Sequence, residues 1–441
     1  MSIVIMVGQL LLGLSILVIL HEFGHFIAAR AFGIKVEKFY LFFDAWGVSL
    51  FKFNYKGVEY GIGWLPLGGY VKIAGMIDES MDTEQLAGPP QPWEFRSKPA
   101  WQRLIVMLAG VTVNILLGIL IFWVLTLKYG QTYTPNDNLK YGIAPGKIGQ
   151  KIGLKAGDKI TAINGKQIEY FDELTSAKVL LGNSVLTVER DGKELSITVP
   201  ATILNDLSDF GIAEFVQPRL KFALDSVSPN TGAQKAGLTK GDSILAINGQ
   251  KVMFFDEIQS TLQDNKNKQV ELTVNHKNVI RQQAAQISKE GTLGFVPKLD
   301  FPKDTNITFG LFGSLPVGTS IAWGTFSTQS KALSKIFTGQ VKARKAISSP
   351  IGIAVMFGSH IDWVHFWKLV GLLSMVLALM NLLPIPALDG GHAVFLIIEM
   401  IKGKPLSDKF LERAQIVGFV ILISLMVFAF GNDIVKQITK K

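Results

Sequence analysis

Residues 3–25 read IVIMVGQLLLGLSILVILHEFGH, an apolar run without charge up to its last five residues. The run is long enough to cross a membrane. No basic residue precedes it and no small-residue cleavage site follows it, so we expect a retained transmembrane helix over residues 1–32. His21 and His25 are four residues apart and therefore share one face of that helix, where they can bind one Zn²⁺. Glu22 lies beside that face and is the candidate general base.

The composition is typical of a membrane protein with several domains. The 441 residues are 48% hydrophobic and 18% charged, and there is no cysteine. Disulfides, cysteine metal sites and cysteine nucleophiles are therefore excluded, and any metal must bind to His, Asp or Glu. The net charge of +9 comes from scattered basic residues and not from a basic tail, so we expect no nucleic-acid binding.

Three further apolar runs predict a polytopic α-helical protein with four transmembrane helices. They lie at residues 104–127, at 366–389, and near 416–430 within a final segment, 390–441, that begins with a cytoplasmic loop. Basic residues gather before the second span and before the fourth, which places those loops in the cytoplasm and both termini in the periplasm. The uncharged stretch at 307–326 contains glycines and a proline, and we interpret it as part of an interfacial or irregular connecting segment, 303–365.

The long segment between the second and third spans contains an internal repeat. GLKAGD at 153–158 recurs as GLTKGD at 237–242, and the Asn-Gly pair at 164 and the Phe-Asp-Glu triplet at 171 recur at the same offset. Each copy combines short β-branched runs with an Asn-Gly turn, which predicts hairpins. We therefore expect two β-rich domains on the periplasmic side, at 128–218 and 219–302, and their pattern resembles tandem PDZ domains.

A second polar motif follows the third span. Residues 381–391 read NLLPIPALDGG, in which two prolines break the helix. Irregular backbone at membrane depth is tolerated only where it lines a cavity or is buried in protein. A catalytic zinc needs a third protein ligand, and Asp389 is the candidate. With four spans Asp389 lies on the same side of the membrane as His21, whereas a fifth span would reverse it. The alternative is that Asp389 only caps the next helix.

These features together resemble the bacterial site-2 proteases of the regulator-of-sigma-E type. The resemblance rests on HEFGH at 21–25, on NLLPIPALDGG at 381–391 and on the repeat between them, and it covers essentially the whole chain. It implies an intramembrane zinc endopeptidase of the cell inner membrane in which His21, His25 and Asp389 bind zinc and Glu22 is the general base. It also implies a lipid-embedded active site near the cytoplasmic side and single-span substrates, such as an anti-sigma factor or remnant signal peptides, that a site-1 protease has cut first.

The resemblance assigns substrate handling to further residues. Asn381 belongs to the family motif, and the GxxxN pattern of the second span falls on Gly110 and Asn114, for which helix packing is an equal alternative. Region 33–103 contains GIGWLPLGGYVK at 61–72, where the family has a membrane-associated β-hairpin. An exposed edge near Gly68 and Gly69 would accept an unwound substrate as an added strand, and a purely structural hairpin is the alternative.

Two other functions compete with proteolysis, and the role of the repeats is open. A membrane scaffold without catalysis would use the repeats to bind envelope proteins, and a metal transporter would need more intramembrane ionisable residues than this chain has. Neither repeat has a clear Gly-Φ-Gly-Φ loop (Φ, apolar) for a peptide terminus, so we expect a gate that excludes untrimmed substrates. Ser349 stands where relatives usually have glycine, which affects only local loop geometry.

Overall fold

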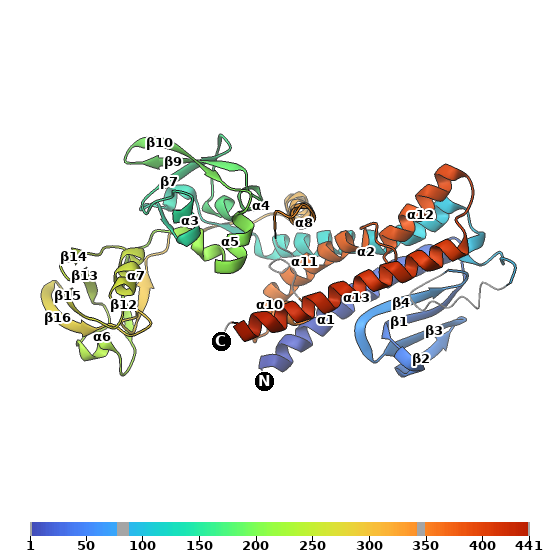
Figure 1. The fold of residues 1–441 in the computed structure, drawn as a ribbon, viewed down its shortest axis with the longest axis horizontal. Coiled ribbons are helices and arrows are strands. Elements are labelled where there is room, and N and C mark those ends of the chain that lie inside the picture. The colour runs from blue at the N-terminus through green and yellow to red at the C-terminus, as the bar shows by residue number, and fades with distance from the viewer. Residues whose placement is uncertain (1, 77–87, 342–348, 440–441) are drawn as a thin grey trace. The chain divides into compact units, whose positions relative to one another are not determined.

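A computed structural model describes residues 2–76, 88–341 and 349–439 of the chain (Figure 1). Two compact units divide these residues. The first unit comprises Met1–Gln131, Thr308–Gly339 and Ala346–Lys441, and the second comprises Thr132–Ile307 and Gln340–Lys345. The second unit is therefore an insertion into the first.

The described residues of the first unit contain four helices long and apolar enough to cross a membrane, as expected. They are α1 (Ser2–Ala31), α2 (Ala100–Tyr129), α11 (Trp363–Asn381) and α13 (Asp408–Thr439). In Figure 1, α1 begins and α13 ends at the same end of this unit. The expected third span, 366–389, was too long at its C-terminal end. A proline lacks the backbone N–H that a helix interior needs, so Pro384 and Pro386 end α11 early.

A further helix, α12 (Asp389–Lys402), follows the two prolines where a loop was expected. Its first turn packs tightly on the preceding turn of chain. A Cβ atom on Gly390 would lie 2.4 Å from the Leu383 carbonyl oxygen, and one on Gly391 would lie 2.4 Å from the Ile385 carbonyl oxygen. The two glycines of the LDGG motif therefore permit the close turn that sets the direction of Asp389.

The stretch expected to be interfacial or irregular is not irregular: it contains most of a regular helix, α8 (Leu311–Phe337), with Pro316 inside it, and α8 is not among the candidate membrane spans of the described residues. It packs along α2 in the first unit. Trp123 Nε1 of α2 donates to Ser314 Oγ at 3.1 Å, and a Cβ on Gly318 would lie 2.5 Å from the Trp123 backbone. Small residues that weaken an isolated helix thus allow close packing here, so tertiary contact overrides local propensity.

Ser349 begins the next helix, α10 (Pro350–Phe357). Its side-chain oxygen accepts a hydrogen bond from the Ile351 backbone N–H at 3.2 Å. Pro350 occupies the first helical position, where its missing N–H is not needed. The serine that departs from the family pattern therefore has a helix-capping role.

A four-stranded sheet follows α1, with β1 (Val36–Phe43) at its centre. Its order is β2-β3-β1-β4, with β2 (Ser49–Tyr55), β3 (Val58–Gly63) and β4 (Leu65–Ile73). β1 pairs with β3 in parallel and with β4 antiparallel. Region 33–103 contains a hairpin, as expected, but it is formed by β2 and β3. Residues 61–72 do not form one, because the chain passes around the end of β1, and β3 and β4 pair with its opposite edges. Gly63 permits this path, since a Cβ there would lie 2.2 Å from the Phe43 carbonyl carbon.

The second unit contains two copies of one sheet, as the sequence repeat predicts. The first copy has the order β10-β9-β7-β8 and the second has the equivalent order β14-β13-β15-β16. A separate hydrophobic cluster fills each copy. The paired strands are β7 (Lys159–Ile163), β8 (Lys166–Gln167), β9 (Ser184–Arg190) and β10 (Lys193–Val199), and then β13 (Ser243–Ile247), β14 (Gln250–Lys251), β15 (Gln269–His276) and β16 (Val279–Gln286).

Shorter elements complete this unit. Strands β6 (Ile143–Pro145) and β11 (Val216–Pro218) pair in the first copy, β12 (Phe222–Val227) and β17 (Phe295–Leu299) pair in the second, and β5 (Gln131–Tyr133) pairs with β18 (Thr305–Ile307) at the base of the insertion. The helices are α3 (Lys147–Lys151), α4 (Ala177–Leu180) and α5 (Ile203–Phe210), followed by α6 (Gly232–Lys235) and α7 (Phe255–Asp264).

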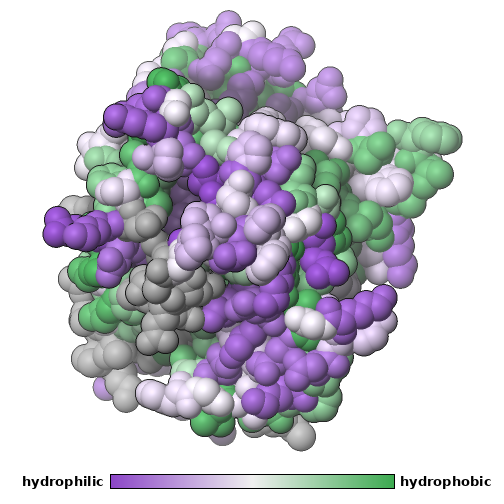
Figure 2. Space-filling model, turned by 90° about the vertical axis from the view of Figure 1, so that its right-hand side faces the viewer, coloured by the Kyte–Doolittle hydropathy of each residue, from purple (hydrophilic) through white to green (hydrophobic). Residues whose placement is uncertain are grey.

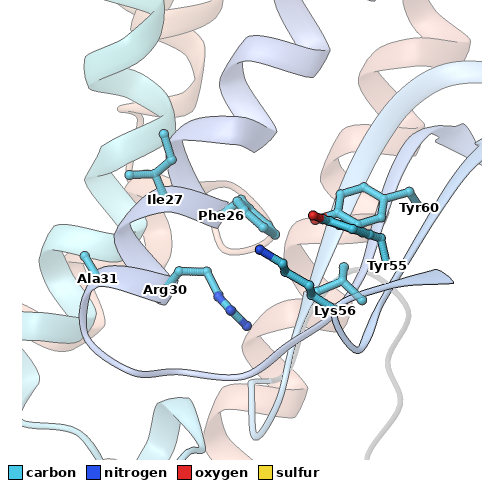
Figure 3. A pocket seen from close by; sticks show the side chains of 8 residues that line it. Phe26, Ile27, Arg30, Ala31, Tyr55, Lys56 and Tyr60 are labelled. Carbon is cyan, nitrogen blue, oxygen red and sulfur yellow. The ribbon is translucent and has the colours of Figure 1, made fainter.

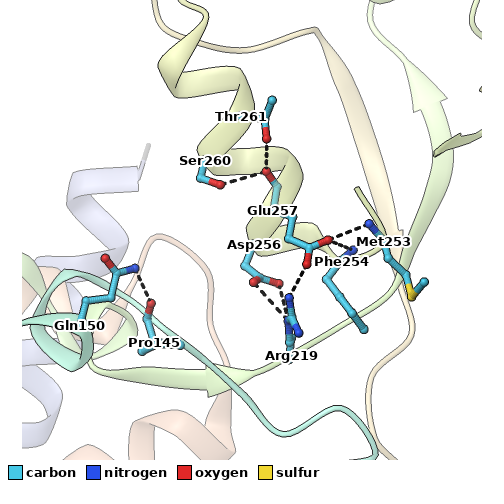
Figure 4. A network of polar contacts seen from close by, with 9 residues as sticks. All are labelled: Pro145, Gln150, Arg219, Met253, Phe254, Asp256, Glu257, Ser260 and Thr261. Atoms are coloured by element: carbon cyan, nitrogen blue, oxygen red, sulfur yellow. Dashed lines mark hydrogen bonds and ion pairs between the residues drawn. The ribbon is translucent and has the colours of Figure 1, made fainter. Parts of the chain in front are cut away.

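Arg219 joins the two copies at the expected domain boundary (Figure 4). Its guanidinium binds Glu257 at 2.5 Å and Asp256 at 3.3 Å, and its backbone N–H donates to the Gly142 carbonyl of the first copy. The guanidinium also lies 3.9 Å from the centre of the Phe254 ring. Burial raises the pKa of Asp256, although the charge of Arg219 opposes that shift.

Candidate metal centre and its cavity

Three candidate ligands separated widely in sequence meet in the first unit. His21 and His25 project from one face of α1, and Asp389 is the first residue of α12. Asp389 Oδ2 lies 3.2 Å from His21 Nε2 and 3.4 Å from His25 Nε2, and the two Nε2 atoms are 3.3 Å apart. Both histidines are buried. Asp389 is the first residue of α12, but the N-cap position belongs to Leu388 and no side chain caps this helix, so the capping alternative for Asp389 is not supported.

The three atoms fit a tetrahedral metal site. In a tetrahedron with metal–ligand distances of about 2.0–2.1 Å, ligand atoms lie about 3.3 Å apart. Asp389 Oδ2 is buried and forms no hydrogen bond with good geometry in the described part of the chain, although two nitrogens are near it. A buried carboxylate oxygen without such a bond is unfavourable unless a cation completes it. Two imidazoles and one carboxylate are a ligand set that Zn²⁺ accepts while keeping an open position.

A backbone carbonyl of α2 orients His25. His25 Nδ1 lies 2.8 Å from the Val106 carbonyl oxygen, so Nδ1 carries the proton and donates. The lone pair of Nε2 is then directed at the cluster, as in most metal-binding histidines. The sequence offered no means of finding Val106, because the contact uses only its backbone.

Asn114 orients His21 from the same helix. Its amide nitrogen lies 3.0 Å from His21 Nδ1, the residue is fully buried, and its amide oxygen has no partner in the described chain. Turning the amide so that its oxygen faces Nδ1 satisfies that oxygen and leaves His21 Nε2 for the metal. Ser374 Oγ fixes this part of α2 by donating to the Asn114 backbone carbonyl at 2.7 Å. Asn114 therefore contacts a ligand from behind and does not line the cavity.

Two glycines let α1 and α2 approach at this level. A Cβ on Gly24 would lie 2.7 Å from the Ala109 carbonyl oxygen. A Cβ on Gly110 would lie 2.4 Å from His25 Nε2 and 2.6 Å from His21 Cε1. A larger residue at position 110 would collide with the two imidazoles. The glycine of the GxxxN pattern therefore makes room for the histidine rings, and not only for a neighbouring helix.

A cavity of about 620 Å³ opens onto the cluster. Glu22, Asn381, Gly68 and Gly69 line it together with the three candidate ligands. The amide nitrogen of Asn381 lies 3.1 Å from His21 Nε2. Strand β4 passes close to Glu22, the candidate general base. A Cβ on Gly69 would lie 3.5 Å from Glu22 Cγ and 2.6 Å from a methyl of Val18. In the described residues β4 pairs with β1 as its one strand partner, so no strand covers its other edge, although the Val71 backbone donates a hydrogen bond to Glu22.

Helix α13 adds a polar residue that the sequence interpretation missed. Gln415 lines the same cavity, is only 4% exposed, and forms no hydrogen bond in the described part of the chain. The helix passes tightly over the proline turn, because a Cβ on Gly418 would collide with the Pro386 carbonyl oxygen. A polar residue within an apolar span is the sequence signal that would have indicated it.

Comparisons with known proteins agree with this chemistry. The model of a family described as "Peptidase family M50" matches residues 9–425. A "Putative zinc metalloprotease" of Vibrio cholerae is 30% identical over 97% of this chain and 97% of its own length. A "Regulator of sigma E protease" of Haemophilus influenzae is 29% identical over 99% and 100%, and the "Regulator of sigma-E protease RseP" of Salmonella typhimurium is 29% identical over 98% and 99%.

Proposed function

The chain belongs to peptidase family M50 and is a site-2 type zinc metalloprotease, and from that premise we propose that it cuts single-span membrane proteins within the bilayer. The observation that carries the proposal is the meeting of His21, His25 and Asp389 beside Glu22 in one cavity among apolar helices. A non-catalytic scaffold has no need for a carboxylate beside a complete set of metal ligands.

The residues that line the cavity and those behind it have separate roles in hydrolysis. Zinc, when bound by His21, His25 and Asp389, supplies a Lewis acid for hydrolysis of the peptide bond. Glu22 takes a proton from the attacking water and returns it to the leaving amine. Val106 and Asn114 keep both imidazoles in the tautomer that binds metal. The apolar walls of the cavity limit bulk water around these charges.

The edge of β4 that no strand covers is suited to hold the substrate. A transmembrane helix hides its carbonyls in hydrogen bonds, so the segment to be cut must be extended before hydrolysis. An extended peptide can add to an unpaired strand edge by main-chain hydrogen bonds. Gly68 and Gly69 line the cavity, and the absence of a side chain on Gly69 lets β4 pack closely against Val18 and beside Glu22.

The names of the relatives support the proposed substrate class, and the distribution of basic residues supports the proposed orientation in the membrane. Two relatives are named regulators of sigma E, so an anti-sigma factor already trimmed by a site-1 protease is the proposed substrate, and remnant signal peptides are a second class. Basic residues gather between α1 and α2 and around the turn from α12 to α13, where Lys402, Lys404, Lys409 and Arg413 lie. By the positive-inside rule the active site lies toward the cytoplasmic side of the inner membrane, with both termini and the repeats periplasmic.

The repeats of the second unit are proposed to act as a gate. They form one insertion, whose first and last strands, β5 and β18, pair with each other. Replacing residues 134–304 with a short glycine-rich linker, long enough to form a turn, keeps both strands of that pair and should let the enzyme cut substrates that still carry their outer domain, with little change on trimmed ones. Paired cleavage assays of full-length and trimmed substrate test this. A loss confined to trimmed substrate would favour binding of a peptide terminus instead.

Glu22→Gln tests the catalytic proposal itself. The amide cannot accept a proton, so we expect cleavage of a model single-span substrate to fall by about 10²–10⁴-fold while zinc content stays at the wild-type level. Glu412→Gln, which removes an exposed carboxylate on α13 outside the cavity, is the matched control. Near-normal turnover by a clean preparation of Glu22→Gln would reject the mechanism.

A further inference from the structure

A second hollow of the first unit lies apart from the metal cluster, between the last turn of α1 and the turn that joins β2 to β3 (Figure 3). Its volume is about 470 Å³. Phe26 and Arg30 line it from the helix, and Tyr55, Lys56 and Tyr60 line it from the strands. None of its lining residues lines the catalytic cavity.

The charge of this hollow is uncompensated. Arg30 and Lys56 point into the gap from opposite sides (Figure 3), and no acidic residue lines it. Neither cation forms an ion pair in the described part of the chain. The acidic residue nearest to the turn, Glu59, is already bound to Tyr40 and Lys38. Two like charges that share one small hollow repel each other and favour an anion between them.

The surroundings place the hollow at a lipid surface. Arg30 lies in the last turn of a membrane-spanning helix. The neighbouring edge strand β2 exposes Leu50, Phe51 and Phe53 by 70%, 58% and 50%, and Trp46 before it is 87% exposed. Figure 2, which faces the right-hand side of Figure 1, shows hydrophilic side chains across its middle and hydrophobic ones gathered toward its right edge. Aromatic residues beside Lys and Arg mark the level of lipid headgroups.

The turn between β2 and β3 carries Lys56, as the turn between β15 and β16 carries Lys277 with a similar φ of 46°. Lys56 and Gly57 both have positive φ, at 47° and 78°. A two-residue hairpin turn of this kind prefers asparagine, aspartate or glycine at its first position. Lys56 directs its ammonium group into the hollow, where Nζ also lies over the Tyr55 ring, 5.3 Å from its centre.

We propose that this hollow binds the phosphate group of an anionic phospholipid. The planar guanidinium of Arg30 can hold two phosphate oxygens, and Lys56 adds a second cationic contact. The apolar side chains of β2 lie beside the acyl chains of the same lipid. Soluble phosphate presents the same oxygens but lacks acyl chains. The apolar side chains of β2 should therefore add to the affinity for the lipid and not to the affinity for soluble phosphate.

Native mass spectrometry of the full-length protein released from detergent tests the proposal. Phosphatidylglycerol, phosphatidylcholine or inorganic phosphate is titrated into wild type, into Arg30→Gln/Lys56→Gln, and into Lys52→Gln/Lys402→Gln, which loses the same charge from exposed positions outside the hollow. We expect wild type and the control to retain one tightly bound phosphatidylglycerol. The Arg30→Gln/Lys56→Gln variant should bind it about 10-fold more weakly or worse.

A charge-conserving pair, Arg30→Lys/Lys56→Arg, separates lost binding from lost folding and should keep most of the affinity. Equal weakening in both glutamine variants would show a net-charge effect and overturn the site. Equal retention of phosphatidylcholine would overturn the requirement for an anion. Binding of inorganic phosphate as tightly as lipid would assign the hollow to a soluble anion and overturn the lipid assignment.

Discussion

Asp242 in the second unit and Asp389 in the first unit are both carboxylates held against histidine, yet their contacts differ in kind. Asp242 Oδ1 lies 2.5 Å from His276 Nδ1, and its Oδ2 accepts from the Thr239 backbone N–H at 2.8 Å. Asp389 Oδ2 lies near two imidazole nitrogens without a hydrogen bond to either. A carboxylate whose two oxygens both accept hydrogen bonds stabilises the fold. A buried carboxylate oxygen without a hydrogen bond, next to the lone pairs of two imidazoles, is suited to bind a cation.

The first repeat supports the same distinction. Asp158 precedes β7 as Asp242 precedes β13, and Arg190 ends β9 where His276 ends β15. Arg190 binds both oxygens of Asp158 at 2.7 Å, and this hydrogen bonding raises the pKa of the guanidinium. The two copies therefore keep a buried carboxylate and exchange only its side-chain partner, Arg190 in the first copy and His276 in the second. Among the described residues of the first unit, by contrast, no lysine or arginine forms an ion pair with Asp389, which faces two imidazoles.

Asp389→Ala should give the largest effect. Two imidazoles alone leave the metal under-coordinated, so zinc affinity should fall by more than about 100-fold and cleavage should be lost with it. Zinc content after mild chelation, measured beside turnover, checks this. His392→Gln, a histidine of the same cavity outside the cluster, should keep its zinc. Stoichiometric zinc in Asp389→Ala would show that the incomplete carboxylate is not a ligand.

Arg190→Met should be next in size. It leaves Asp158, only 1% exposed, as a buried charge without its partner, which costs about 3–5 kcal/mol. Hydrogen exchange of the full-length protein should show faster opening of β7 and β9, with β13 and β15 as the internal control. Arg190→Lys keeps one charged contact and should lose less. Unchanged exchange in β7 would contradict the view that this pair completes the repeat.

Gln415→Leu should act mainly on function. The carboxamide faces the cavity, so its replacement by an apolar side chain should change the free energy of unfolding by less than about 1 kcal/mol. If Gln415 meets substrate, kcat/KM should fall about 10-fold through KM, with zinc content unchanged. Gln415→Asn is the conservative comparison. Lower stability with unchanged KM would make Gln415 a structural residue.

Asp256→Asn should give the smallest effect, and one that depends on pH. The raised pKa of Asp256 means that the folded state holds its proton to higher pH than the unfolded state does. Its contribution to stability is therefore present at low pH and declines as pH rises through the folded pKa. The asparagine variant lacks this decline, so its advantage over wild type, below about 1 kcal/mol, should grow with pH. Exchange rates in α7 check this, and a pH-independent difference would contradict the assignment.

The sheet and the connecting helix show where prediction from sequence failed. The Asn-Gly turns and the repeat offset predicted the hairpins and the two copies correctly, because each depends on residues close in sequence. Residues 61–72 were interpreted as a hairpin, but Tyr40 and its neighbours in β1 lie between β3 and β4. Likewise α8 forms although its glycines and Pro316 disfavour a helix, because α2 provides a surface on which those small residues pack.

The sequence by itself determined the pair of imidazoles, the glutamate beside them and the four apolar helices, since helical periodicity and membrane length are local properties. Only the tertiary structure decided that Asp389 meets His21 and His25, that Gly110 leaves space for the two rings, and that the Val106 carbonyl sets the tautomer of His25. Those contacts join residues tens to hundreds of positions apart. Their geometry depends on how closely helices and turns pack, which no local pattern of residues encodes.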